Sequence, residues 1–192
     1  MSITPTAPFV TSMAIDSLLL KKVPNSEATM ELPPEQRTFP CKSLRTEMNY
    51  DRPYPSATID VSFGKGLVAS KDCPVGTVME KFEGLVVDYS ELGEDDIIYA
   101  LNFQQDNQWK WMIASTPAIY ANHGCKPNAT VNDKQEIVSI RPIKAGEHVA
   151  FVYNQGNKQD KWDPLWTFHC KCGATKCQGM VDSYRPWEPL YD

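Results

Sequence analysis

Apolar residues in this chain form short runs that glycines and polar residues interrupt, a pattern typical of short β-strands. Such runs predict strands at residues 58–63, 66–69, 78–87, 109–113, 136–141 and 148–153. The segment 89–102 starts acidic and turns apolar, which predicts an acidic loop or short helix leading into a strand, and 115–120 predicts a short helix. No segment carries the 3.6-residue stripe of a long helix, so the sequence predicts a mainly β protein with few short helices.

The prolines set the beginning of the chain apart from the rest. Eight of the 15 prolines lie within residues 1–56, which lack sustained apolar periodicity, so we predict a Pro-rich N-terminal arm or flanking segment there. The core domain is predicted at 57–157, and a cysteine-rich segment with a C-terminal tail at 158–192. The tail from 182 onward is rich in aromatic residues, and we expect it to fold back over the cofactor or substrate groove.

The charge balance narrows the class of partner. A net charge of -5 argues against direct nucleic-acid binding, which depends on Lys and Arg at the phosphates, and it suits a basic protein or peptide as the partner. No apolar stretch is long enough for a membrane span, and the first ten residues lack the regions of a secretory signal. We therefore expect an intracellular protein, in the nucleus or the cytoplasm; the sequence leaves its oligomeric state open.

The cysteines predict a metal site near the C-terminus. Three of the six form a C-x-C-x4-C group, at Cys170, Cys172 and Cys177. Structural zinc needs four ligands, so a fourth must come from elsewhere in the chain. Cys125 is the best candidate, His169 is an alternative, and a chance grouping of buried cysteines is the remaining interpretation.

Four segments in order resemble the SET-domain methyltransferase family. Residues 122–128 (N-H-G-C-K-P-N) resemble its N-H-S-C-x-P-N signature, and the C-x-C-x4-C group resembles its post-SET segment. Residues 64–69 (G-K-G-L-V-A) are similar to its G-x-G strand, and residues 140–153 to the stretch that ends in a catalytic tyrosine. The resemblance spans about residues 58–179, and it includes no pre-SET cysteine cluster.

The resemblance implies a SET fold, made of small curved sheets with a knot-like C-terminal threading and a post-SET zinc segment. It implies an S-adenosylmethionine-dependent lysine N-methyltransferase. Its catalytic residues would be Tyr153 and Tyr99. The residues implied to bind the cofactor, S-adenosyl-L-methionine, are Gly64, Lys65, Gly66, Asn122, His123, Tyr153 and Phe168. The implied zinc ligands are Cys125, Cys170, Cys172 and Cys177.

The chain departs from the family pattern at a few positions. Gly124 replaces a serine, Val152 replaces an aspartate, and Ile119 stands where arginine is common; either Ile97 or Tyr99 matches the second active-site tyrosine. These departures leave three other hypotheses open. The chain could be a SET-like binding module without transferase activity, or an enzyme for a specialised or small-molecule substrate. A zinc-ribbon nucleic-acid binder is disfavoured by the acidic charge.

Overall fold

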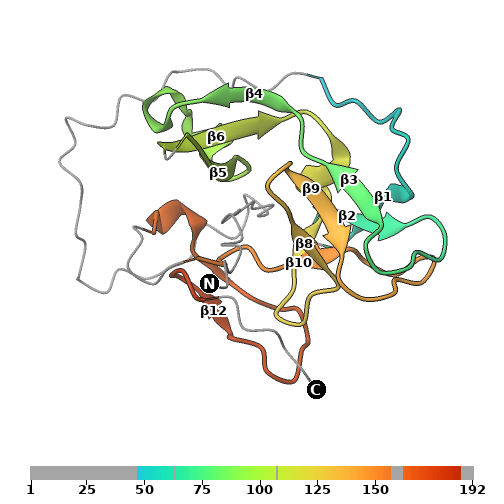
Figure 1. The fold of residues 1–192 in the computed structure, drawn as a ribbon. Coiled ribbons are helices and arrows are strands. Elements are labelled where there is room, and N and C mark those ends of the chain that lie inside the picture. The colour runs from blue at the N-terminus through green and yellow to red at the C-terminus, as the bar shows by residue number, and fades with distance from the viewer. Residues whose placement is uncertain (1–46, 63, 107, 157–161, 187–192) are drawn as a thin grey trace, which may run out of the picture.

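Short β-strands dominate the part of the chain that the computed structural model describes, which is residues 47–62, 64–106, 108–156 and 162–186. Within these residues twelve strands form five small sheets, and the helical elements are at most four residues long (Figure 1). The predicted mainly β class is confirmed. Of the predicted N-terminal arm only residues 47–56 are described, and Cys41 lies outside the described residues. None of the described helices is long and apolar enough to cross a membrane.

A β-hairpin opens the domain and carries the first glycine-rich segment. Strand β1 (Ser56–Val61) pairs antiparallel with β2 (Gly64–Ala69). The first two residues of β2 are exposed, whereas the last four are buried, so the strand runs from the surface into the core. On its other side, the amide of Val149 donates to the carbonyl of Leu67 at 2.8 Å. This second contact joins the hairpin to the C-terminal part of the domain.

Two three-stranded antiparallel sheets form the body of the domain (Figure 1). One has the order β3-β9-β8, with β3 at Val78–Lys81, β9 at Glu136–Ser139 and β8 at Ala129–Val131. The other has the order β4-β6-β5, with β4 at Gly84–Val87, β6 at Gln108–Ala114 and β5 at Leu101–Gln105. The predicted strand at 78–87 is therefore two strands in different sheets, because the chain changes sheet at residues 82–83.

The remaining elements are short. The helical ones are η2 (Tyr89–Glu91), α1 (Glu94–Ile97), η3 (Pro117–Tyr120) and η4 (Pro164–Trp166). Strand β7 (Asn122–His123) pairs in parallel with β10 (Ala150–Phe151), and β11 (Phe168–His169) pairs antiparallel with β12 (Met180–Val181). The predicted strand at 148–153 is thus shorter than expected, since only two of its residues form ladder pairs in β10.

One hydrophobic core receives side chains from both three-stranded sheets and from the hairpin. Fully buried members, each with 0% exposure, include Leu67, Met79, Ile97, Leu101, Ile137, Ile143 and Val149. Burial of such side chains contributes roughly 1.5–3 kcal/mol each. The core therefore supplies the stability that the short strands cannot provide by backbone pairing alone.

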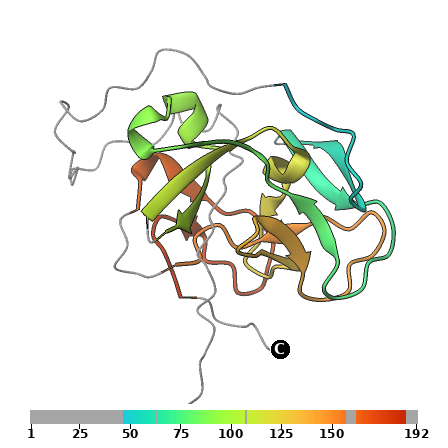
Figure 2. The same cartoon turned by 45° about the horizontal axis from the view of Figure 1, so that its top comes forward.

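Aromatic residues of the C-terminal segment fasten it to this core. Of the aromatic residues in the tail from 182 onward, Tyr184 is described, whereas Trp187 and Tyr191 lie outside the described residues. The ring of Trp162 meets those of Trp166 and Tyr184 edge-on, with centroids 5.6 and 5.1 Å apart. Trp166 Nε1 donates to the carbonyl of Ile97 at 3.1 Å, and Asn102 Nδ2 donates to the Tyr184 hydroxyl at 2.9 Å. In Figure 2, η4 accordingly lies next to the helical turns of η2 and α1.

A buried ion pair holds the segment before β1 to the domain. Glu80 on β3 is only 1% exposed, and it accepts hydrogen bonds from Arg52 Nε at 3.2 Å and Ser56 Oγ at 3.3 Å. Replacing Arg52 by alanine would leave this carboxylate buried without its cation. We expect Arg52→Ala to lower the free energy of unfolding by about 3 kcal/mol in urea denaturation.

Lys144→Ala is the matched control for this prediction. Lys144 pairs with Asp72 at 2.8 Å, but both side chains are largely exposed, so its loss should lower the free energy of unfolding far less than the loss of Arg52. Equal destabilisation by the two substitutions would contradict the role given to Arg52.

Candidate active site and metal centre

The parallel pair β7–β10 brings the two most characteristic sequence segments together. Asn122 pairs with Ala150 and His123 with Phe151, and the Gly124 amide donates to the Phe151 carbonyl at 3.0 Å. Just beyond β10, the backbone amide of Tyr153 donates to His123 Nδ1 at 3.1 Å. The predicted catalytic tyrosine therefore lies directly beside the predicted cofactor-binding pair, although 30 residues separate Tyr153 from His123 in sequence.

Tyr153 is held in one orientation. It is 1% exposed, and its hydroxyl donates to the carbonyl of Ala121 at 2.8 Å. The rings of Phe151 and Phe168 lie 5.0 and 6.0 Å from its ring. A buried tyrosine normally finds a hydrogen-bond partner for its hydroxyl, and here that partner belongs to the residue just before β7. Packing and this hydrogen bond together place the hydroxyl beside the signature segment.

The glycine-rich start of β2 lies against β7. Asn122 Nδ2 donates to the backbone carbonyl of Lys65 at 3.2 Å. A Cβ on Gly66 would come within 2.9 Å of His148 Cε1 and 3.5 Å of Asn122 Nδ2, so a side chain would displace its neighbours there. Gly64 has φ +122°, which L-residues rarely adopt. Lys65 turns its side chain away to Asp60, 2.9 Å from it, which leaves backbone to line this junction.

Phe168 completes the group from the C-terminal segment. It lies on β11, and its half-buried ring meets that of His123 at 5.6 Å in addition to that of Tyr153. Hydrogen bonds and ring contacts thus connect residues of three distant segments that the resemblance assigns to cofactor binding. A backbone-lined junction, an oriented amide and an aromatic ring fit a ligand that combines polar groups with a flat heteroaromatic ring, as S-adenosylmethionine does.

The two candidates for a second active-site position differ in their surroundings. Ile97 ends α1 with 0% exposure, and its carbonyl accepts from Trp166 Nε1. Tyr99 follows α1, and its ring packs half-buried against the core near the start of β5. Ile97 therefore acts as a core anchor, whereas Tyr99 has both a hydroxyl and exposed surface. A role of Tyr99 in the reaction stays a prediction.

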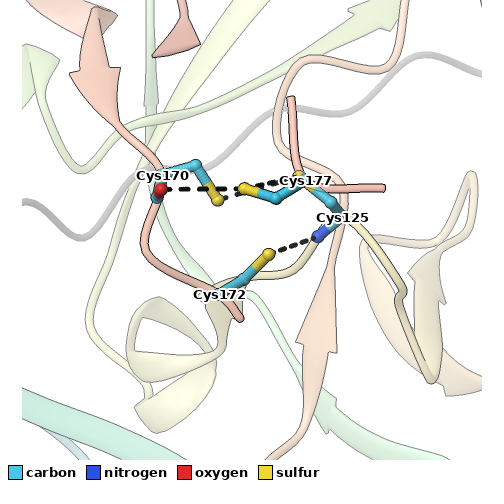
Figure 3. Close-up of side chains that lie close together, drawn as sticks. All are labelled: Cys125, Cys170, Cys172 and Cys177. Carbon is cyan, nitrogen blue, oxygen red and sulfur yellow. Dashed lines mark hydrogen bonds between the residues drawn. The ribbon is translucent and has the colours of Figure 1, made fainter. Parts of the chain in front are cut away.

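Four cysteine sulfurs meet at the base of the C-terminal segment (Figure 3). The sulfurs of Cys125, Cys170, Cys172 and Cys177 all lie within 4.8 Å of one another. Cys125 Sγ is 3.7 Å from Cys170 Sγ and 4.0 Å from Cys177 Sγ. Tetrahedral zinc with Zn–S bonds near 2.3 Å would separate its sulfurs by about 3.8 Å, so the spacing fits zinc. The group contains Cys125 and not the alternative His169, which is exposed on β11.

Backbone amides point at these sulfurs, as they do around metal-bound thiolates. The amides of Gln178 and Cys125 donate to Cys125 Sγ and Cys172 Sγ at 3.5 Å, and that of Gly179 donates to Cys177 Sγ at 3.4 Å. Burial raises the pKa of the Cys125 thiol. Burial also raises the pKa of Cys172, but amide donors and neighbouring thiols outweigh it and lower the pKa to about 7. Four thiols with amide donors are the donor set that zinc takes in structural sites.

Asn128 is a structural residue of the site that the sequence did not single out, although it closes the signature segment. It is 2% exposed; its Oδ1 accepts from the Ala150 amide at 2.9 Å, and its Nδ2 donates to the His148 carbonyl at 2.7 Å. It therefore fixes the loop after β7 against β10. Gln178, which contacts His123, and Asn154, which contacts Gln178, gave no sequence signal, because isolated amides carry no pattern.

Comparison with known proteins identifies the central part of this fold. Residues 64–154 match the family model of the SET domain. A crystal structure of KRYPTONITE in complex with mCHG DNA and SAH superposes with a TM-score of 0.51 at 17% identity, over 67% of this chain and 29% of that chain. Residues 64–154 are therefore similar to a SET domain, and the described part of the chain has the predicted small-sheet fold.

Curated relatives match at low identity. Methyltransferase flvH of Aspergillus flavus is 29% identical over 66 residues, which cover 33% of this chain and 35% of that protein. Histone-lysine N-methyltransferase 2D of Homo sapiens is 26% identical over 138 residues, or 62% of this chain and 2% of that protein. This chain thus spans only part of the relatives' length.

Proposed function

We propose that the protein is an S-adenosylmethionine-dependent lysine N-methyltransferase that acts on a basic protein segment. One observation carries the proposal: the buried Tyr153 hydroxyl is oriented beside Asn122–His123, which in turn contacts the glycine-rich turn of β2. Relatives named as methyltransferases support the same reaction class.

The proposed reaction asks for positioning more than for acid–base groups. Bound S-adenosylmethionine supplies an electrophilic methyl group on a sulfonium. A lysine amine, whose pKa in water is about 10.4, must lose its proton before its nitrogen can bond to the methyl carbon as the sulfur–carbon bond breaks. A site of buried aromatic residues, such as Phe151 and Tyr153, favours the neutral amine. The Tyr153 oxygen would orient that amine, and Tyr99 would line another side of the channel that receives the substrate lysine.

Backbone groups and one amide would hold the cofactor. The backbone of Gly64–Gly66 and the side chain of Asn122 would bind its polar end, and Phe168 would stack on its adenine ring. The KRYPTONITE structure carries SAH, the demethylated form of this cofactor. The hydrogen bond from Asn122 to the Lys65 carbonyl and the ring contact between His123 and Phe168 support this assignment.

Zinc is proposed as a structural ion of the post-SET segment. All four ligands would be thiolates, so no coordination position remains for a reacting water. Its role would be to hold Phe168 and the C-terminal segment against β7.

The substrate class is proposed from charge. The chain carries -5 overall, and acidic residues Asp88, Glu91 and Asp95 are exposed around η2 and α1. Such a surface attracts a basic peptide, of which a histone tail is one example, in the nucleus or cytoplasm.

A second candidate function is a SET-like binding module without transfer, which the departures at Gly124 and Val152 favour. The structure accounts for the first departure by packing. A Cβ on Gly124 would lie 3.0 Å from the Ala150 Cβ, so a serine there would require Ala150 to move slightly. The absence of a side chain at Gly124 therefore allows β7 and β10 to lie close together.

The experiment that tests the proposal uses S-adenosylmethionine with a labelled methyl group. Incubation with core histones and with fractionated cell extract should label protein, and hydrolysis should place the label on the lysine ε-nitrogen. Calorimetry with the same cofactor is run in parallel. Binding without transfer to any fraction would favour the binding module, and label confined to small molecules would favour the small-substrate alternative.

A further inference from the structure

His123 uses both ring nitrogens in contacts that link the predicted cofactor site to the cysteine group. Its Nδ1 accepts from the Tyr153 amide at 3.1 Å, and its Nε2 lies 3.3 Å from Cys125 Sγ. A backbone N–H can only donate, so Nδ1 carries no proton. In a neutral imidazole the proton must then sit on Nε2. The Tyr153 contact thereby determines the tautomer.

Among the residues that the structure describes, two groups lie within hydrogen-bond distance of this Nε2–H, and one of them can accept. The side-chain nitrogen of Gln178 is 3.2 Å away. Its orientation is decided by Asn154, whose Nδ2 donates to the Ser183 carbonyl at 2.7 Å and also to Gln178 Oε1 at 3.2 Å. The Gln178 oxygen is thus turned to Asn154, and its NH2 group faces His123. The Cys125 sulfur is the acceptor that remains.

We propose that His123 is a positioning residue for the metal site: its Nε2–H donates to the Cys125 thiolate, and its Nδ1 holds the backbone of Tyr153. Cys125 is 1% exposed, so a thiolate there needs donors in place of water. The Gln178 amide supplies one at 3.5 Å, and His123 supplies the second. A continuous chain of contacts then runs from the zinc through Cys125 and His123 to Tyr153. Through these contacts, bound zinc helps to orient the tyrosine that the proposed reaction uses.

Two substitutions separate this role from a merely structural one. In His123→Gln, the side-chain nitrogen can take the place of Nε2 and still donate a hydrogen bond to the Cys125 sulfur. In His123→Asn, the side-chain oxygen can take the place of Nδ1 and accept from the Tyr153 amide, but the donor to the sulfur is lost. Zinc affinity is measured by competition with a chromophoric chelator. We expect His123→Asn to weaken zinc binding about 10–100-fold and His123→Gln to stay close to wild type. Equal weakening in both variants, or none in His123→Asn, would overturn the inference.

A spectroscopic measurement on the unaltered protein gives an independent answer. With ¹¹³Cd in the cysteine site, an N–H···S–Cd hydrogen bond should give a correlation between the metal and the imidazole proton, and ¹⁵N spectra should show Nδ1 unprotonated. A proton on Nδ1 would overturn the inference. The inference rests on the proposed zinc site, and metal analysis keeps the two apart. If the wild-type protein contains no zinc, the proposed zinc site is refuted. If it contains zinc and His123→Asn binds zinc with unchanged affinity, only the role of His123 is refuted.

Discussion

Cys125→Ser is expected to weaken zinc binding about 100–1000-fold and to abolish measurable cofactor binding. Structural zinc sites contribute about 10–16 kcal/mol in total, so one of four thiolates accounts for roughly 2.5–4 kcal/mol, which corresponds to that loss of affinity. Of the four proposed ligands, Cys125 lies within residues 64–154, which match the SET domain, while the other three come from residues 170–177. Its loss therefore separates the C-terminal segment, including Phe168, from β7. Chelation of the wild-type protein should have the same effect.

The measurements are metal analysis, zinc competition and calorimetry with S-adenosylmethionine. Hydrogen exchange should show faster exchange in β11 and β12 while β3-β9-β8 stays protected. Cys73→Ser is the matched control, because Cys73 is also buried but its thiol donates to the Lys71 carbonyl, at 3.3 Å, and lies outside the four-cysteine group. Its zinc affinity should equal that of wild type. Wild-type zinc affinity in Cys125→Ser would refute the four-thiolate site.

Tyr153→Phe is expected to lower the rate of methyl transfer at least about 100-fold while cofactor affinity changes little. Removing one oriented polar group from a reacting centre typically costs this much. The hydroxyl hydrogen bond to Ala121 is lost as well, so the free energy of unfolding should fall by about 1 kcal/mol. Because this loss of stability is small, a large loss of transfer rate in Tyr153→Phe cannot be explained by unfolding.

Single-turnover transfer from labelled S-adenosylmethionine measures the rate, and urea denaturation measures stability. Tyr50→Phe serves as the control, since Tyr50 is 55% exposed and its hydroxyl lies 3.4 Å from that of Tyr120. This control should transfer at the wild-type rate. A wild-type rate in Tyr153→Phe would exclude the catalytic assignment.

The longer strands were predictable from the sequence because they carry a readable pattern. The alternation at Trp109–Trp111 gave β6, and the apolar run at 136–139 gave β9. Strands β7, β8, β11 and β12 were not predicted, since two or three residues are too few to show a period. The division of residues 78–87 into β3 and β4 could not be predicted from the sequence either. Both halves are apolar, and only pairing with different partners separates them.

The sequence by itself determined the mainly β class, the cysteine group and the signature residues, because each depends on residue types at short spacing. Only the tertiary structure decided that Cys125 and not His169 joins the three C-terminal thiols, that Ile97 is core, and that His123 contacts both Cys125 and Tyr153. Those outcomes depend on the meeting of β2, β7, β10 and β11. Contacts between segments tens of residues apart are set by packing of the whole domain, which no local pattern encodes.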